Sequence, residues 1–163
     1  VAQLMRDLGS IPAPMNSFIL NLGLQTLHLR MAQHCSNAQR VAEFLQADPR
    51  VAWVHYSGLP GDAYHELAEK YLPGGSCGVI AFGLKGDRET AIRFMDSLDM
   101  INIVTHVADA RTCVLHPASH THRQLSDEQL REAGVAPDLI RLSVGIEDCD
   151  DILDDIRQAL DKI

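Results

Sequence analysis

The stretch Cys77–Leu84, with the sequence CGVIAFGL, limits the possible folds of this chain more than any other feature. It is the most apolar run of the sequence, and turn-forming residues 73–75 precede it. A short run that is apolar at nearly every position is typical of a strand with both faces covered. The segment Leu139–Val144 instead alternates apolar and polar residues, as a strand with one covered face does. Together the two segments predict a sheet in which Cys77–Leu84 is an interior strand.

A long amphipathic helix is predicted from Asn16 to Asp48. Asparagine commonly caps the start of a helix, and an Asp-Pro step ends one, because the residue before proline disfavours helical backbone. The apolar positions between these ends recur every three or four residues: Leu20, Leu24, Leu27, Met31, Ala38, Val41 and Leu45. Residues 1–15 contain glycine and proline and predict an irregular segment before this helix.

The rest of the chain reads as short strands alternating with helices. Further strands are predicted at residues 51–54, 101–107 and 112–115, and further helices begin near residues 65, 87, 126 and 147. The link within 101–115 is too short for a helical crossover between parallel strands. We therefore expect one α+β domain over residues 16–163, with an antiparallel or mixed sheet of about four strands and helices mainly on one face.

The size and charge of the chain exclude several classes of protein. With 163 residues, of which 46% are hydrophobic and 22% charged, the composition is that of a globular domain. A formal net charge of -8 and the lack of a basic run argue against nucleic acid and anionic membranes as main partners. No apolar stretch reaches the ~20 residues of a membrane-spanning helix. The four cysteines lie far apart without a CxxC pair, which predicts reduced thiols in a cytoplasmic protein.

Arg141 is a residue that could carry a specific function. Strand alternation puts Ile140 and Leu142 on one face and Arg141 and Ser143 on the other, shortly before Gly145. A guanidinium fixed on a strand can hold a carboxylate through two parallel hydrogen bonds, which a lysine cannot do. The alternative is a surface arginine paired with Glu147 or another acid. The residues alone leave both interpretations open.

Two other segments invite a metal-binding or catalytic interpretation. Three histidines lie within residues 116–122, but Pro117 interrupts them, and neither a helical ligand pair nor a neighbouring cysteine accompanies them. A loop whose histidines and hydroxyls bond to the backbone is favoured, and no metal site is predicted. Cys113 could act as a nucleophile with His116 or His106, but its place in an apolar strand favours a buried structural role.

Six segments, taken in order, resemble one enzyme family. They are residues 23–34 (GLQTLHLRMAQH), 54–59 (VHYSGL), 65–68 (HELA), 77–82 (CGVIAF), 116–122 (HPASHTH) and 141–147 (RLSVGIE). From about Leu8 onward, the chain resembles the C-terminal domain of the pyridoxal-phosphate (PLP) enzymes of cysteine and methionine metabolism, the transsulfuration enzymes. This is the small domain of the fold-type-I PLP-dependent transferases. Residues 119–125 and 138–148 are most similar to the O-acetylhomoserine sulfhydrylases of that family.

The resemblance implies roles for two residues. In the family, the arginine that corresponds to Arg141 binds the α-carboxylate of the substrate, and a short polar loop lies over the substrate. The corresponding loop here is His106-Val107-Ala108-Asp109, which makes His106 a second candidate substrate-binding residue. Histidine stands where the family commonly has serine or asparagine, and Ala108 stands where it commonly has glycine.

The resemblance also implies that the cofactor is held elsewhere. In the family, PLP forms a Schiff base with a lysine of the large domain that precedes this one. Lys70, Lys85 and Lys162 are the lysines of this chain, and none lies in a predicted apolar pocket beside an aspartate. We therefore expect no catalytic or cofactor-binding residue here, no bound PLP and no activity without the large domain. Apolar surface on one side of the sheet and on the long helix should mark the contact with that partner.

The resemblance implies a PLP-dependent transferase of methionine biosynthesis that forms a homo-oligomer. In its reaction sulfide replaces the acetate of O-acetylhomoserine to give homocysteine, so an amino acid of that kind would be the substrate. A methionine γ-lyase or a cystathionine γ-synthase of the same family is one alternative. A stand-alone binding or oligomerisation module is an alternative of a different class.

Overall fold

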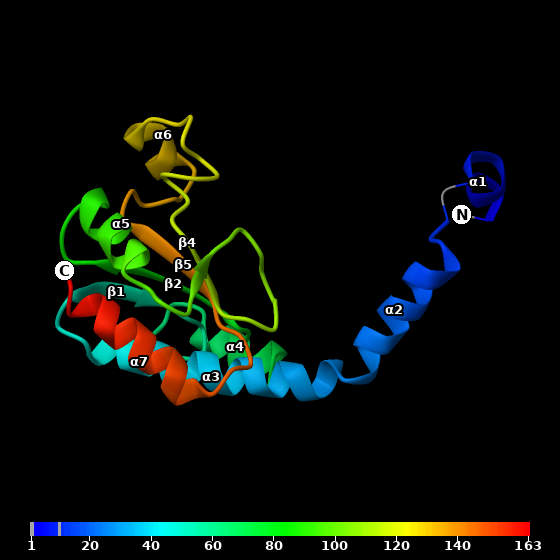
Figure 1. Cartoon of the computed structure of the whole chain (residues 1–163), viewed down its shortest axis with the longest axis horizontal. Coiled ribbons are helices and arrows are strands. Elements are labelled where there is room, and N and C mark those ends of the chain that lie inside the picture. Colours follow the sequence, from blue (N-terminus) through cyan, green and yellow to red (C-terminus); the bar gives the residue numbers. More distant parts are fainter. Residues whose placement is uncertain (1, 10) are drawn as a thin grey trace. The chain divides into compact units, whose positions relative to one another are not determined.

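The computed structural model describes residues 2–9 and 11–163 of the chain (Figure 1). The chain divides into two compact units, residues 1–30 and 31–163. Within the described residues, no helix is both long enough and apolar enough to cross a membrane.

The first unit contains helices α1 (Ala2–Leu8) and α2 (Pro14–Gln25), whose described residues are all exposed or half-buried. The irregular segment predicted over residues 1–15 was wrong for α1, where alanine, leucine, methionine and arginine favour a helix. Val1 and Ser10 lie outside the described residues. The predicted helix start at Asn16 was also wrong. The helix begins at Pro14, because the fixed φ of proline suits the first turn of a helix.

The single long helix predicted after this start is two helices. α3 (Leu27–Ala47) follows α2 after Thr26, whose φ of -110° and ψ of 7° end the first helix. Gly23 and the β-branched Thr26 are poor helix formers, which favours a break at this point. Arg30 donates to Gly23 O (2.5 Å) and to Thr26 Oγ1 (3.4 Å). α3 ends at Ala47, as the following Asp-Pro step predicts.

The second unit is built on one five-stranded sheet with the order β1-β2-β5-β4-β3. Its strands are β1 (Val51–His55), β2 (Val79–Leu84), β3 (Asn102–Ile103), β4 (Cys113–Leu115) and β5 (Leu139–Ser143). β2 pairs antiparallel with β1 on one side and with β5 on the other. The mixed sheet of an α+β domain is confirmed, and so is the interior position of the apolar run, although its strand begins at Val79.

The edge strand β3 differs from the prediction. A strand was predicted over residues 101–107, but only Asn102 and Ile103 pair with β4, and they do so in parallel. The short link favoured an antiparallel pair. Instead, the chain makes a loop over residues 104–112 before it enters β4 (Figure 1). A hydrogen bond from the Ala108 amide to Ser143 of β5 and one from the Ile146 amide to Ala110 O take the place of the ladder that a longer strand would have made.

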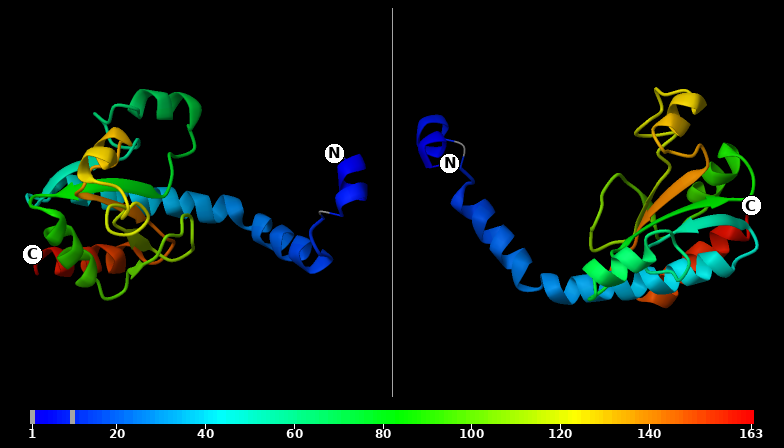
Figure 2. Two further views of the ribbon diagram at one scale, coloured as in Figure 1. Left: turned by 90° about the horizontal axis from the view of Figure 1, so that it is seen from above. Right: turned by 180° about the vertical axis from the view of Figure 1, so that it is seen from behind.

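The core lies between one face of the sheet and helices α3, α5 (Arg88–Asp96) and α7 (Cys149–Leu160). Figure 2 shows α3 and α7 side by side along that face. Their apolar side chains form one buried cluster with those of the strands, which includes Val41, Leu45, Ile80, Phe82, Phe94, Ile140, Leu142 and Ile156. The shorter helices α4 (His65–Tyr71) and α6 (Asp127–Glu132) complete the unit. The helix starts predicted at Asp87 and Ser126 are confirmed by their caps.

Candidate functional site

Arg141 lies in the middle of β5, which is bonded to β2 on one side and to β4 on the other. Ile140 and Leu142 are buried in the core, whereas Arg141 is half-buried on the opposite face. The face predicted for Arg141 by strand alternation is therefore confirmed. Because β5 is paired along both edges, the guanidinium projects from a fixed backbone.

Only some of the N–H donors of the Arg141 guanidinium have hydrogen-bond acceptors among the described residues. Nη2 donates to the carbonyl oxygens of Thr105 (2.9 Å) and His106 (3.3 Å). Nε is buried and makes no hydrogen bond with any residue that the structure describes. A buried N–H without an acceptor costs about 1–3 kcal/mol, so an oxygen ligand at this edge would be favourable. A carboxylate suits the site because its two oxygens match the parallel N–H groups of a guanidinium.

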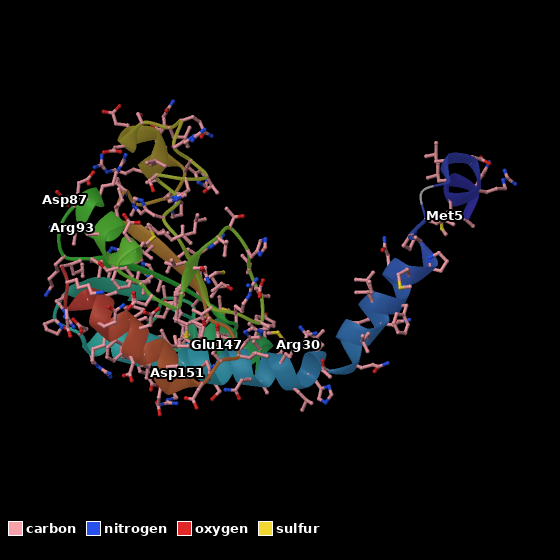
Figure 3. All side chains as sticks on the ribbon, in the orientation of Figure 1. Met5, Arg30, Asp87, Arg93, Glu147 and Asp151 are labelled. Atoms are coloured by element: carbon pink, nitrogen blue, oxygen red, sulfur yellow. The ribbon has the colours of Figure 1, made fainter. Side chains whose placement is uncertain are left out.

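The surface ion pair between Arg141 and Glu147, considered as the alternative, is not formed. The Glu147 carboxylate accepts hydrogen bonds from the Thr112 amide (2.5 Å) and the Thr112 hydroxyl (2.9 Å) instead. Glu147 lies where the chain passes from β5 toward α7 (Figure 3). Arg141 is thus left without a carboxylate partner among the described residues.

The predicted substrate loop, His106–Asp109, lies beside Arg141. His106 reaches Arg141 through its backbone carbonyl, whereas its side chain is 64% exposed and its Nδ1 lies 3.4 Å from Asp109 Oδ2. Asp109 also accepts hydrogen bonds from the Arg111 amide (3.0 Å) and the Arg111 side chain (3.5 Å). These bonds lower the pKa of Asp109 to about 2. The loop therefore bonds to the guanidinium through its backbone carbonyls, while the side chains of Asp109 and Arg111 bond to each other.

Ala108 has a left-handed backbone conformation, with a φ of 60°. An L-residue other than glycine in this region costs roughly 1–2 kcal/mol. The Ala108 amide donates to the Ser143 hydroxyl (3.0 Å), so the loop is tied to the end of β5. The conformation gives a physical reason for the glycine that the resembling family commonly has at this point.

Sequence reasoning missed residues that hold the loop over Arg141. Strand alternation places Ser143 on the same face as Arg141, but it gave no sign of the bond from the Ala108 amide to the Ser143 hydroxyl. Thr105 contributes only its carbonyl oxygen, which no side-chain pattern reveals. Thr112 bonds to Glu147 from a distant part of the chain, so no local pattern pointed to it.

The histidines at 116–122 form hydrogen bonds within their own loop and with Pro137. His116 is buried, with Nε2 2.8 Å from Pro137 O and Nδ1 2.9 Å from Ser119 Oγ. His120 Nδ1 also lies 2.9 Å from Ser119 Oγ. These bonds agree with the loop interpretation. Across the described part of the chain, no three side chains of the ligand types gather where they could hold a metal ion.

Cys113 is buried in β4, and its Sγ donates to the carbonyl oxygen of His106 (3.3 Å). Burial raises the pKa of the Cys113 thiol. A raised pKa disfavours the thiolate that a nucleophilic cysteine needs, so the geometry supports a structural role.

The lysines of this chain do not fit a PLP site. Lys70 is exposed on α4, with its Nζ 5.0 Å from the centre of the Tyr71 ring. Lys85 and Lys162 are exposed as well. A Schiff-base lysine works in a desolvated pocket, which none of these side chains occupies. We therefore assign no residue of this chain to the cofactor.

Comparison with known proteins decides the family. The model of the Cys/Met metabolism PLP-dependent enzymes matches residues 1–161. The chain belongs to this family. The predicted family membership, with its likeness to the O-acetylhomoserine sulfhydrylases, is thereby confirmed.

Several family members are similar along nearly the whole chain. O-acetyl-L-homoserine sulfhydrylase 1 of Thermus thermophilus is 43% identical over 156 residues, or 96% of this chain. Homocysteine synthase of Schizosaccharomyces pombe is 44% identical over 159 residues, or 98% of this chain. The chain spans only 37% of the length of each of these two relatives.

A solved structure shows the same fold. It is a putative O-acetylhomoserine (thiol)-lyase of Campylobacter jejuni that contains N'-pyridoxyl-lysine-5'-monophosphate. It matches this chain with a TM-score of 0.89 and 39% identity. The match covers 99% of this chain and 38% of the solved chain.

Proposed function

We propose that this chain is the C-terminal domain of a PLP-dependent O-acetylhomoserine sulfhydrylase of methionine biosynthesis. In the proposed reaction, the bond between the γ-carbon of O-acetylhomoserine and its acetate oxygen breaks. Sulfide then forms a carbon–sulfur bond at the same carbon, giving homocysteine and acetate. The two curated relatives described above carry names for this chemistry, and their similarity along nearly all of this chain supports the proposal. PLP and its lysine would come from the part of the protein outside this chain.

The observation that carries the proposal is the buried, unbonded Nε of Arg141. The α-carboxylate of the substrate would accept hydrogen bonds at this edge of the guanidinium, and that contact would orient the amino acid. His106 is proposed as a second contact, because its backbone carbonyl bonds to Arg141 and its side chain is exposed. This chain would then bind and orient the substrate, while the PLP-bearing part carries out bond breaking.

We propose further that the PLP-binding part of the protein is the main partner and that the enzyme is a homo-oligomer. Exposed apolar side chains on α1 and α2 support a contact of this kind. We place the enzyme in the cytoplasm. All four cysteines are free thiols, which supports a reducing compartment.

The test uses the enzyme encoded by the complete reading frame. Arg141→Lys removes the two-point contact, and a charge-assisted hydrogen bond contributes about 1.5–3 kcal/mol. We therefore expect kcat/KM for O-acetylhomoserine to fall by roughly tenfold to a hundredfold. The KM for sulfide and the absorbance of the bound cofactor should stay as in the wild type.

Arg131→Lys, at an exposed arginine on α6, is the matched control and should behave as the wild type. Near-normal kcat/KM in Arg141→Lys would remove this residue from the substrate site, and loss of bound cofactor would make its role structural. A wild-type enzyme that forms no homocysteine from O-acetylhomoserine and sulfide would contradict the proposed reaction.

A further inference from the structure

The turn that joins β5 to α7 is held on one side by α3. His34 Nδ1 donates to Val144 O (2.7 Å). Asn37 Nδ2 donates to the carbonyl oxygens of Gly145 (3.1 Å) and Glu147 (2.9 Å). Both α3 side chains are buried, so these hydrogen bonds are protected from competition with water. With β5 already paired along both edges, the backbone of the turn is fixed.

On its other side, the same turn bonds to the loop over residues 104–112. The Glu147 carboxylate accepts from the Thr112 amide and hydroxyl, and the hydroxyl oxygen of Thr112 accepts from the Gly145 amide (2.8 Å). The Ile146 amide donates to Ala110 O (2.9 Å). A side chain at Gly145 would collide with the Glu147 carboxylate and with the loop backbone, so glycine permits this close approach.

Glu147 supplies the charged group in this junction. An ionised carboxylate only accepts hydrogen bonds. Here its two oxygens accept from the amide and the hydroxyl of one residue, Thr112. Hydrogen bonds to an ionised group are roughly twice as strong as those between neutral groups. Because the turn is held by α3 and the strand by its neighbours, loss of the Glu147 contact would loosen the loop and leave β5 in place. The loop would keep the neutral bonds from the Gly145 and Ile146 amides and the bond from Ala108 to Ser143.

The loop that Glu147 holds is the one that orients Arg141. Its Thr105 and His106 carbonyls accept from Arg141 Nη2, and its Ala108 amide bonds to Ser143. A loop that is free to shift would move both carbonyls away from the guanidinium. Arg141 would then lose the contacts at Nη2 that keep its Nε edge oriented toward a ligand.

We propose that Glu147 is a positioning residue for Arg141. By bonding Thr112, it holds the loop in the place where the Thr105 and His106 carbonyls orient the guanidinium for a substrate carboxylate. The proposal rests on the proposed function, since the orientation matters for catalysis only if Arg141 binds the substrate. A merely structural role would predict a loss of stability throughout the second unit. The positioning role predicts a change confined to the loop and Arg141.

Amide hydrogen exchange measured by NMR on this chain tests the local effect. In Glu147→Ala, the amides of Ala108, Thr112 and Gly145 should exchange faster, on the order of tenfold, while those of β2 keep their wild-type rates. The NMR signal of the Arg141 Nε–H should also shift. Glu147→Gln keeps one acceptor for the Thr112 amide and should restore much of the protection.

Glu132→Ala, at an exposed glutamate on α6, is the matched control and should leave exchange and the Arg141 signal unchanged. Wild-type exchange at Ala108 and Thr112 in Glu147→Ala would overturn the proposal. A uniform rise that includes β2 would also overturn it, because it would show a general structural role.

Kinetics of the enzyme from the complete reading frame test the consequence. Glu147→Ala should raise the KM for O-acetylhomoserine on the order of tenfold, with the KM for sulfide and the absorbance of the bound cofactor unchanged. Glu147→Gln should recover most of the loss. A fall in kcat at unchanged KM would overturn the proposal. If the wild type forms no homocysteine, the proposed function fails, and the exchange rates and the Arg141 signal still decide whether Glu147 holds the loop.

Discussion

His116 is buried, and both of its ring nitrogens have hydrogen-bond partners. Nε2 donates to the Pro137 carbonyl, so the neutral ring can accept from the Ser119 hydroxyl at Nδ1. Burial lowers the pKa of His116 below its ordinary value of 6.5, and the nearby Arg88 and His120 act in the same direction. The folded protein therefore favours the neutral form of this side chain.

We expect the free energy of unfolding to fall as the pH is lowered from about 7.5 to about 5.5. The unfolded state binds a proton at His116 near pH 6.5, whereas the folded state binds it only at lower pH, so added protons favour unfolding. Urea denaturation at the two pH values measures the change. The lowered pKa values of Asp48, Asp87 and Asp109 affect stability only at more acidic pH, so the two effects separate.

A variant assigns this pH dependence to one residue. His116→Gln keeps an N–H donor for Pro137 but does not titrate in this range, so its stability should vary less with pH. His28→Gln, at an exposed position on α3, should keep the wild-type dependence. Equal pH dependence in His116→Gln and the wild type would contradict the assignment.

Among the helices, α6 shows how much a short element depends on its cap. The Ser126 hydroxyl accepts from the Gln129 amide (3.3 Å), and the Gln129 side chain accepts from the Ser126 amide (2.9 Å). A helix as short as Asp127–Glu132 is barely stable by itself, because the free-energy cost of nucleating a helix exceeds the stabilisation from the hydrogen bonds of one turn. Its stability therefore comes from this capping box and from the buried Leu130.

Ser126→Ala should lower the free energy of unfolding by about 1 kcal/mol, because one amide of the first turn loses its acceptor. Ser126→Thr should lower it less, since threonine is also a capping residue. The urea midpoint should shift at constant slope. Ser97→Ala, where the described hydrogen bonds use only the backbone of Ser97, is the control. A Ser126→Ala effect no larger than that of the control would contradict the role of the cap.

For the molecule as a whole, the first unit is notable for its exposed apolar side chains. On α2, Phe18 is 61%, Leu20 65% and Leu24 61% exposed. The apolar surface predicted for this helix is confirmed. On the sheet, exposed apolar residues occur at the β3 edge and in the adjoining loop, at Ile103 and Val107. Surfaces of this kind commonly mark a contact with another protein surface.

We expect this chain to self-associate when studied alone, because burying these side chains against a second copy removes apolar area from water. Sedimentation velocity over a range of concentrations measures it. Phe18→Gln combined with Leu22→Gln should shift the chain toward monomer, and the conservative Asn21→Gln on the same helix should not. A wild-type chain that is monomeric at every concentration would contradict the prediction.

Local patterns in the sequence determined the main elements and the face of the central candidate residue. The apolar run in β2, the alternation in β5 and the caps at Asp87 and Ser126 all depend on residues a few positions apart. Backbone periodicity therefore sufficed to place them. The same periodicity put Arg141 opposite the core, and the family resemblance gave it a role to test.

Only the tertiary structure decided what surrounds Arg141. The carbonyl of Thr105, the Thr112 bond to Glu147 and the Asn37 bonds to the turn join segments that are distant in the sequence. The parallel pairing of β3 with β4 likewise depended on how the loop between them bonds to β5. Such contacts depend on the order of the strands and on the path of the loops. Neither can be predicted from the local periodicity of apolar residues.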